Sequence, residues 1–373
     1  MLLNFLKLHY FLQHTKMGKS ANTISIFTFF IVFILCSFSF VYSIEKPNVK
    51  ISNFGETQFT INWDDKNKET KIIVVRLSET KQIPPRIGSN YKPNPIFSTT
   101  TQNNLTGTGN AIVYIGNDPK GSVYISNLPK EKDYSIDFYY KTDENKDNSF
   151  TFSAYTLGEK PKKQANGISF KNISSTTMEL SWRNGSGAYR IVVVREEEKP
   201  EPPNSGQSYS ANSQFGKGSL TGNNSYVVYS GNGNKVKITN LKPNRKYYAH
   251  VYEFNGADKK ANYNTDDVIA NPNARLTLLE TPKLLEHHVF SRTAFSPKWT
   301  AVEGADFYEI DVATDKDFKN CLDEYKNTDI GNSTEWEIHG LTPGQTYYYR
   351  IRAKSNKNYS FYSEPKKVLL NVK

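Results

Sequence analysis

The sequence predicts an all-β protein in which three tandem β-sandwiches follow an N-terminal signal segment. Two repeated patterns support this prediction. A strand that alternates apolar and polar residues and ends on a tryptophan occurs three times. A later strand also occurs three times, and each copy is followed by a leucine, a proline and, six residues after the leucine, a tyrosine. The third observation is length, because the roughly 330 residues after the signal segment exceed one compact core and divide into three units of about 110. The 13% aromatic content, with 22 Gly and 17 Pro, excludes a disordered tail or a helical rod as the main body.

Residues 1–43 have the features of a targeting segment. No charged residue lies between Lys19 and Glu45, and the stretch is strongly apolar at its centre. A basic N-terminal region, an apolar run and small residues near a cleavage site are typical of a secretory signal peptide, and we expect cleavage after Ser43. A later start at Met17 would give a more ordinary leader. An uncleaved membrane anchor is the other alternative, since an uncharged run of this length could span a bilayer.

The three predicted sandwiches span residues 44–158, 159–282 and 283–373. Alternation in each tryptophan strand places every second side chain on one face, which is the face expected to be buried. The proline of the later motif ends one strand and reverses the chain. The tyrosine hydroxyl is then expected to bond to the backbone upstream and so to fix the corner between two sheets. The tryptophans are Trp63, Trp182 and Trp299, and the corner tyrosines are Tyr134, Tyr247 and Tyr347.

These motifs together resemble tandem fibronectin type III domains over nearly all of residues 44–373. The third unit is the most similar, through its segments 299–305, 341–347 and 359–365. The first two units resemble a variant found in exported multidomain proteins of Gram-negative, gliding-type bacteria. The resemblance implies β-sandwiches that display surfaces for protein contacts or hold partners at a distance, although a fold alone does not establish a function.

An insertion distinguishes the first two units from the third. The distance from the tryptophan to the corner leucine is 65 and 59 residues in these units, against 42 in the third. Their strands at 72–75 and 191–194 are also apolar without a break, which requires cover on both faces. We expect each insertion to fold over the outer face of that strand and to supply aromatic cover. The aromatic residues, which are also candidates for partner binding, are Tyr91, Phe97, Tyr209 and Phe215.

The positive charge is concentrated in the middle unit. The whole chain carries a formal net charge of +10, and Lys and Arg outnumber Asp and Glu by 7 in residues 159–279, while the flanking units are nearly neutral. A basic strip can neutralise phosphates or acidic glycans. Solvated lysines around a tyrosine corner are the simpler interpretation, and we do not expect a nucleic-acid partner. The basic candidates for partner binding are Lys235, Lys237, Arg245 and Lys246.

No pattern in the sequence predicts a catalytic residue, a cofactor or a metal site. The four histidines after residue 43 stand outside metal-ligand spacings, and no nucleophile elbow or phosphate-binding glycine loop occurs. Cys321 is the only cysteine after residue 43, so no disulfide can form within this part of the chain. Tandem small sandwiches also offer no deep shared cleft. We therefore expect a protein that is not an enzyme.

The sequence favours an exported, non-enzymatic protein, secreted or at the cell surface, with the periplasm as an alternative compartment. Its sandwiches would mediate protein–protein interaction, adhesion or scaffolding at the cell envelope, as a module or as a subunit of a larger envelope or secretion assembly. Membrane contact would come only through an uncleaved signal segment or a partner. The alternative is a glycan-binding accessory protein that uses exposed aromatics. A glycan binder should show a row of exposed coplanar rings, whereas a protein binder should show an apolar patch or an unpaired edge strand.

Overall fold

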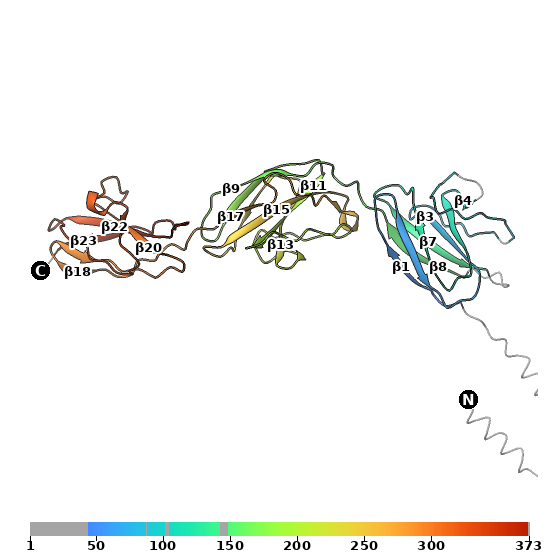
Figure 1. Ribbon diagram of the computed structural model, residues 1–373, viewed down its shortest axis with the longest axis horizontal. Helices are drawn as coiled ribbons and strands as arrows, with labels where there is room; N and C mark the ends of the chain where they lie inside the picture. The colour runs from blue at the N-terminus through green and yellow to red at the C-terminus, as the bar shows by residue number, and fades with distance from the viewer. Residues whose placement is uncertain (1–43, 87, 101–103, 142–147, 372–373) are drawn as a thin grey trace, which may run out of the picture. The chain divides into compact units, whose positions relative to one another are not determined.

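The chain forms three pairs of β-sheets, each pair a sandwich, which confirms the predicted all-β class (Figure 1). The computed structural model describes residues 44–86, 88–100, 104–141 and 148–371, so the predicted signal segment at 1–43 lies outside the described residues. The described residues contain no α-helix, and their helical structure is limited to short 3-10 turns. Among them, no helix has the length and apolar composition that crossing a bilayer requires.

The first sandwich pairs a sheet of order β1-β2-β6 with a sheet of order β4-β5-β3-β7-β8, and every pairing is antiparallel. The tryptophan strand is β2, and the continuous apolar strand is β3. The strands are β1 (Asn48–Ser52), β2 (Phe59–Asp64), β3 (Lys71–Leu77), β4 (Leu105–Gly107), β5 (Asn110–Gly116), β6 (Lys120–Ile125), β7 (Asp133–Tyr140) and β8 (Ser149–Tyr155).

The second sandwich repeats this arrangement. Its smaller sheet has the order β9-β10-β14, and its larger sheet has the order β12-β13-β11-β15-β16, with β17 also paired to β15. The elements are β9 (Asn166–Lys171), β10 (Met178–Arg183), β11 (Tyr189–Glu196), β12 (Leu220–Gly222), β13 (Ser225–Gly231), β14 (Lys235–Ile238), β15 (Lys246–Asn255), the 3-10 turn η2 (Asp258–Lys260), β16 (Asn262–Tyr263) and β17 (Asn273–Leu276).

The third sandwich is smaller, because it lacks the inserted hairpin strands. It pairs β18 and β19 with a sheet of order β21-β20-β22-β23. The elements are β18 (His288–Ser291), β19 (Ala294–Ser296), β20 (Phe307–Ala313), the 3-10 turn η3 (Asp323–Tyr325), β21 (Thr328–Asp329), β22 (Thr346–Lys354) and β23 (Lys366–Leu369).

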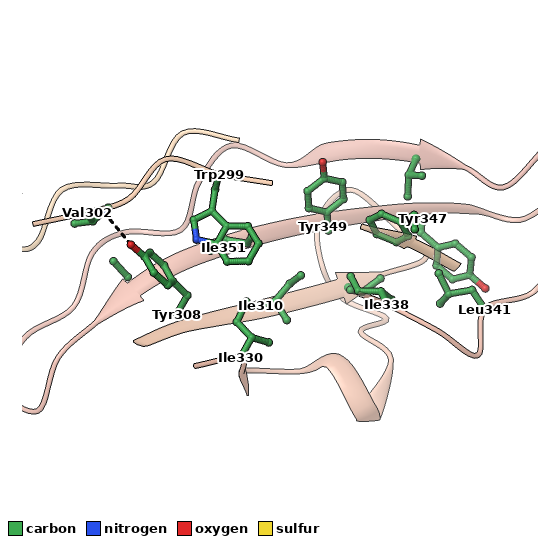
Figure 2. Close-up of a cluster of buried hydrophobic side chains, with 14 of the residues drawn as sticks. Trp299, Val302, Tyr308, Ile310, Ile330, Ile338, Leu341, Tyr347, Tyr349 and Ile351 are labelled. Carbon is green, nitrogen blue, oxygen red and sulfur yellow. Dashed lines mark hydrogen bonds between the residues drawn. The ribbon is translucent and has the colours of Figure 1, made fainter. Parts of the chain in front are cut away.

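Each sandwich has its own core around the predicted tryptophan. Figure 2 shows the third core, where Trp299 is 2% exposed and its ring centroid lies 5.5 Å from that of Tyr308. The Tyr308 hydroxyl accepts a hydrogen bond of 2.8 Å from the backbone N–H of Val302, so this buried phenol is paired. Burial alternates residue by residue along β22, as the predicted period of two requires.

The three tyrosine corners are present, with one difference in bonding. In the second and third sandwiches the corner hydroxyl accepts a hydrogen bond of 3.0 Å from the backbone N–H of Lys242 or Thr342. In the first sandwich the equivalent position is Pro129, which has no N–H. There the Tyr134 hydroxyl instead donates a bond of 2.9 Å to the Pro129 carbonyl. The corner therefore tolerates proline because a phenol can either donate or accept.

Two of the four insertion aromatics cover the outer face of the continuous apolar strand, as predicted. Tyr91 packs against the outer-face cluster of the first sandwich that contains Val74. Tyr209 packs against the outer-face cluster of the second sandwich that contains Val193. Each hydroxyl accepts a backbone N–H from its own insertion, at 2.9 Å in the first sandwich and 3.0 Å in the second. The insertion thus partly buries an aromatic ring and leaves its hydroxyl paired.

The prediction that Phe97 and Phe215 join this cover is wrong, because both pack beside the corner tyrosines between the two sheets. The ring of Phe97 lies 5.8 Å from that of Tyr134, and the ring of Phe215 lies 5.1 Å from that of Tyr247. The physical cause is a backbone hydrogen bond that places each phenylalanine at the end of the facing sheet. Phe97 N–H donates to the carbonyl of Ser126 at 2.8 Å, and Phe215 N–H donates to that of Thr239 at 2.9 Å.

Each insertion therefore joins the two sheets of its sandwich. A few residues before the phenylalanine, the Asn94 N–H donates to Ile112 in β5 at 3.0 Å, and the Asn212 N–H donates to Val227 in β13 at 3.1 Å. The insertion is thus bonded to a strand of the larger sheet and to the end of a strand of the smaller one. The same bonds at matching positions in both repeats show that the insertion is part of the sandwich.

The third sandwich covers its outer face with charged side chains instead of an insertion. Asp311 and Glu309 on β20 are nearly buried, and Arg350 and Arg352 on β22 pair with them. Both guanidinium groups lie over the ring of Tyr362, at 4.0 Å and 4.6 Å from its centroid. The alternating strand in this unit therefore needs no apolar cover, which explains why it differs in pattern from β3 and β11.

Candidate functional site: a basic sheet face

The outer face of the smaller sheet in the second sandwich collects basic side chains. Its central strand, β10, points Glu179 outward, and cross-strand neighbours share a face of a sheet. Glu179 lies opposite Lys171 on β9 and opposite Lys237 on β14. One row across the sheet is therefore lysine, glutamate, lysine.

The neighbouring rows add two further cations. Ser181 lies opposite Lys235 on one side and Ser169 on the other, and the two serine hydroxyls are 2.9 Å apart. At the end of β10, the Arg183 Nε donates to the side-chain oxygen of Asn166 at 2.9 Å. We call the four exposed cations Lys171, Arg183, Lys235 and Lys237, together with Glu179, the basic sheet face.

The charges of this face are not neutralised within the part of the chain that the structure describes. None of its four cations forms an ion pair with a described carboxylate, and Glu179 accepts a hydrogen bond of 2.7 Å from Asn172 Nδ2. Four cations and one carboxylate leave a local charge of +3. In the first sandwich the equivalent face is closer to neutral, because Lys120 pairs with Asp64 at 3.0 Å. The positive excess of the middle unit is thus partly concentrated on one sheet face.

The strand that carries Lys235 and Lys237 is also an edge. Among the described strands, β14 is hydrogen-bonded to β10 alone. Only past its end does a parallel bridge join Thr239 to Gln214 of the insertion. An edge strand presents unpaired backbone donors and acceptors, and lysines on an edge are a usual protection against unwanted strand pairing.

The structure does not bring Arg245 and Lys246 to this face. Lys246 begins β15, in the other sheet, and its backbone N–H donates to the Glu197 carboxylate at 3.1 Å. A hydrogen bond with Tyr248 is the main cause that raises the pKa of the Lys246 ammonium group. Arg245 Nε lies 3.7 Å from the carboxylate of Glu196. These two residues therefore belong to the tyrosine corner and its neighbouring acids.

Sequence reasoning missed Lys171 and Arg183. Arg183 directly follows the strand tryptophan, at an outward position that alternation alone identifies. Lys171 could be placed only with the register between β9 and β10, which a single sequence does not contain. Of the insertion aromatics predicted as partner-binding residues, Phe97 is 2% exposed and so offers a partner no surface.

No metal-ligand cluster of three or more His, Cys, Asp or Glu side chains occurs within the described ranges. The most buried histidine, His250 on β15, stacks on Tyr252 with ring centroids 3.9 Å apart. Burial lowers the pKa of His250 to about 4, because the apolar surroundings disfavour the imidazolium ion. At neutral pH this histidine is an uncharged packing residue.

A match to a protein-family model agrees with the sandwich architecture. A family model described as "Fibronectin type III domain" matches residues 160–265 and 281–368. Among solved structures, the chain is similar to the crystal structure of the chicken CNTN1 FN1–FN3 domains, with 12% identity, a TM-score of 0.25, and coverage of 88% of this chain and 99% of that chain. It is also similar to a two-domain fibronectin type III segment of chicken tenascin, with 15% identity, a TM-score of 0.25, and coverage of 57% and 94%. No curated protein matches the sequence.

Proposed function

Because the chain belongs to the fibronectin type III family, whose domains commonly mediate protein–protein interaction, we propose that it is an exported, non-enzymatic interaction protein. It acts as an adhesive or scaffolding component at the cell envelope, secreted or displayed at the surface, and as a subunit of a larger assembly. The predicted signal segment supports export. The observation that carries the proposal is the basic sheet face, a polar surface with a local excess of positive charge beside an open strand edge.

The chemistry of this face favours an acidic protein partner. Lysine and arginine side chains on a flat sheet attract a negatively charged surface, steer its approach and reject basic proteins. The free edge of β14 adds backbone donors and acceptors for an acidic extended segment of the partner, whereas its lysines disfavour pairing with neutral or basic strands. Charge complementarity of this kind sets the rate of association and the specificity, and its contribution weakens as salt is raised.

Reversing three charges of the face tests the proposal. The variant Lys171→Glu/Lys235→Glu/Lys237→Glu should bind the envelope partner at least about tenfold more weakly, a loss of about 1.4 kcal/mol. Its matched control, Lys162→Glu/Lys163→Glu/Lys217→Glu, changes three exposed lysines of the same unit outside this face and should bind as the native chain does. The measurement is quantitative mass spectrometry of proteins recovered from the envelope fraction on each immobilised form.

The expected pattern is a set of acidic proteins retained by the native chain and the control, depleted on the face variant and released by higher salt. Equal recovery on all three forms would reject the basic sheet face as the binding surface.

A further inference from the structure

The outer face of the larger sheet in the second sandwich contains an aromatic hollow of about 270 Å³. Its walls come from the starts and ends of strands β11, β13, β15 and β16, from the insertion, and from the turn between β15 and β16. We define the aromatic hollow by these lining residues: Tyr189, Ser208, Tyr209, Ser230, Phe254, Gly256, Ala257, Asp258, Ala261 and Tyr263.

Four rings follow one another along the hollow. The centroids of Tyr189 and Phe254 are 5.6 Å apart, with planes inclined by 31°. Phe254 and Tyr263 are 4.9 Å apart at 42°, and Tyr263 and Tyr209 are 6.0 Å apart at 65°. Tyr189 is 46% exposed, while Tyr263 is 3% exposed. Tyr189 therefore lies at the open end of the row, and Tyr263 forms its buried wall.

Two of these rings, Tyr189 and Phe254, have no aromatic counterpart in the first sandwich. Tyr209 covers the outer face, and Tyr91 does the same in the first sandwich. Arg190 on β11 lies opposite Glu253 on β15, and the equivalent neighbours in the first sandwich are Lys71 on β3 and Tyr140 on β7. By that register, Tyr189 corresponds to Thr70 and Phe254 to Lys141. The first sandwich thus keeps its cover without an aromatic residue at either position.

The polar lining consists of acceptors and hydroxyls that are free in the described structure. The carboxylate of Asp258 and the hydroxyls of Ser208, Ser230 and Tyr189 make no hydrogen bond to described residues. By contrast, the Tyr263 hydroxyl donates to the Gln207 carbonyl at 3.1 Å, and the Tyr209 hydroxyl is also paired. Asp258 has a φ of 50°, in the left-handed region that aspartate tolerates, and the turn that forms this rim is closed by a hydrogen bond of 3.1 Å from the Ala261 N–H to the Asp258 carbonyl. The open end therefore combines stacking surface with unpaired polar groups.

From this arrangement we infer that the aromatic hollow binds a neutral sugar unit of a glycan chain. A pyranose has an apolar C–H face that packs on the electron-rich face of an aromatic ring, and hydroxyls at its edge that donate to a carboxylate or a serine. The hollow is close to the lower end of the roughly 300–1,000 Å³ range of small-ligand sites, which suits one or two sugar rings. No lining residue is cationic, and Asp258 repels anions, so an acidic sugar is disfavoured.

A proline-rich peptide is the competing ligand, because proline rings also stack on aromatic grooves. Such a peptide offers backbone carbonyls and few N–H groups, since proline has none. The exposed carboxylate of Asp258 accepts hydrogen bonds, and a sugar hydroxyl supplies a donor for it, whereas a polyproline segment does not. The carboxylate at the rim therefore favours the sugar.

Calorimetric titration of the full chain with four neutral oligosaccharides tests this inference. The probes are cellohexaose, mannohexaose, maltohexaose and chitohexaose, with decaproline as the peptide arm, each raised to about 10 mM so that a Kd of about 1 mM or tighter is measured. At least one oligosaccharide should bind. Tyr189→Ala and Asp258→Asn should each weaken that binding, the former at least about tenfold.

The double variant Tyr189→Thr/Phe254→Lys distinguishes loss of binding from misfolding, because it introduces the residues that the first sandwich carries at these positions. It should retain the native thermal transition and lose oligosaccharide binding. Tyr124→Ala, at a 50% exposed tyrosine on β6 of the first sandwich, should bind as the native chain does. Absence of binding by all four oligosaccharides, equal binding by the double variant, or binding of decaproline alone would overturn the inference.

Discussion

Replacing Phe97 with alanine should destabilise the first sandwich by about 3–5 kcal/mol, the usual cost of removing a buried aromatic side chain. Phe97 is 2% exposed and packs edge-on against the corner tyrosine, Tyr134. The lost ring would leave a cavity between the two sheets, at the point where the insertion joins them. Chemical unfolding of the full chain, followed by the fluorescence of the buried tryptophans, measures the shift.

The neighbouring residue supplies the control. Ile96 is 54% exposed in the same insertion, so Ile96→Ala should change the free energy of unfolding by no more than about 0.5 kcal/mol. A small and equal effect of both substitutions would mean that the insertion lies on the surface and that the core does not include it.

Replacing Glu253 with alanine should cost the second sandwich about 3–5 kcal/mol, because it leaves the buried charge of Arg190 without a partner. The two side chains are 0% and 4% exposed, with Arg190 Nε 3.2 Å from the Glu253 carboxylate. The same carboxylate accepts the backbone N–H groups of Gly185 and Gly187, each at 2.9 Å. A Cβ at Gly187 would lie 2.8 Å from that carboxylate, so glycine is needed for the loop to close on it. Differential scanning calorimetry of the full chain measures the loss.

Glu179→Ala is the matched control for this prediction. Glu179 is an outward-facing glutamate on β10 of the same sandwich, and its removal should change stability by no more than about 0.5 kcal/mol. Glu253→Gln should fall between the two, because the amide oxygen still accepts one backbone N–H but does not neutralise Arg190. A loss below about 1 kcal/mol for Glu253→Ala would mean that water reaches the pair and screens it.

Much of the fold could be predicted from the sequence, because its determinants are local. Alternation up to Trp299 and the spacing from Leu341 to Tyr347 are read within a few residues. Even the reversed hydrogen bond at Tyr134 follows from Pro129, which lacks an N–H. Such signals depend on backbone chemistry and on the period of a strand, so a single chain is enough to find them.

The insertion could be predicted only in part, because its path has no period. Tyr91 and Phe97 are both aromatic and only six residues apart, yet one covers the outside of a sheet and the other packs between the sheets. The difference depends on a hydrogen bond from Phe97 to Ser126, a contact between distant parts of the sequence. Residue type indicated burial correctly but not the side of the sheet.

The candidate site shows the same limit. Lys237 and Lys246 are close in sequence but lie in different sheets, because the tyrosine corner reverses the chain between them. Lys171 and Lys237 are far apart in sequence but flank the same glutamate, Glu179. Charge clusters in a β-sandwich form across strands, so proximity along the chain is a poor guide to them.

Amide hydrogen exchange of the full chain tests most directly the central claim that the insertions are part of the sandwich cores. The informative amides are those of Asn94, Phe97, Asn212 and Phe215, whose hydrogen bonds join the two sheets. They should exchange about as slowly as amides in β7 and β15, because the same opening of the core exposes them. Exchange at the rate of an unstructured loop would contradict the claim and would mean that the insertions lie on the surface, outside the cores.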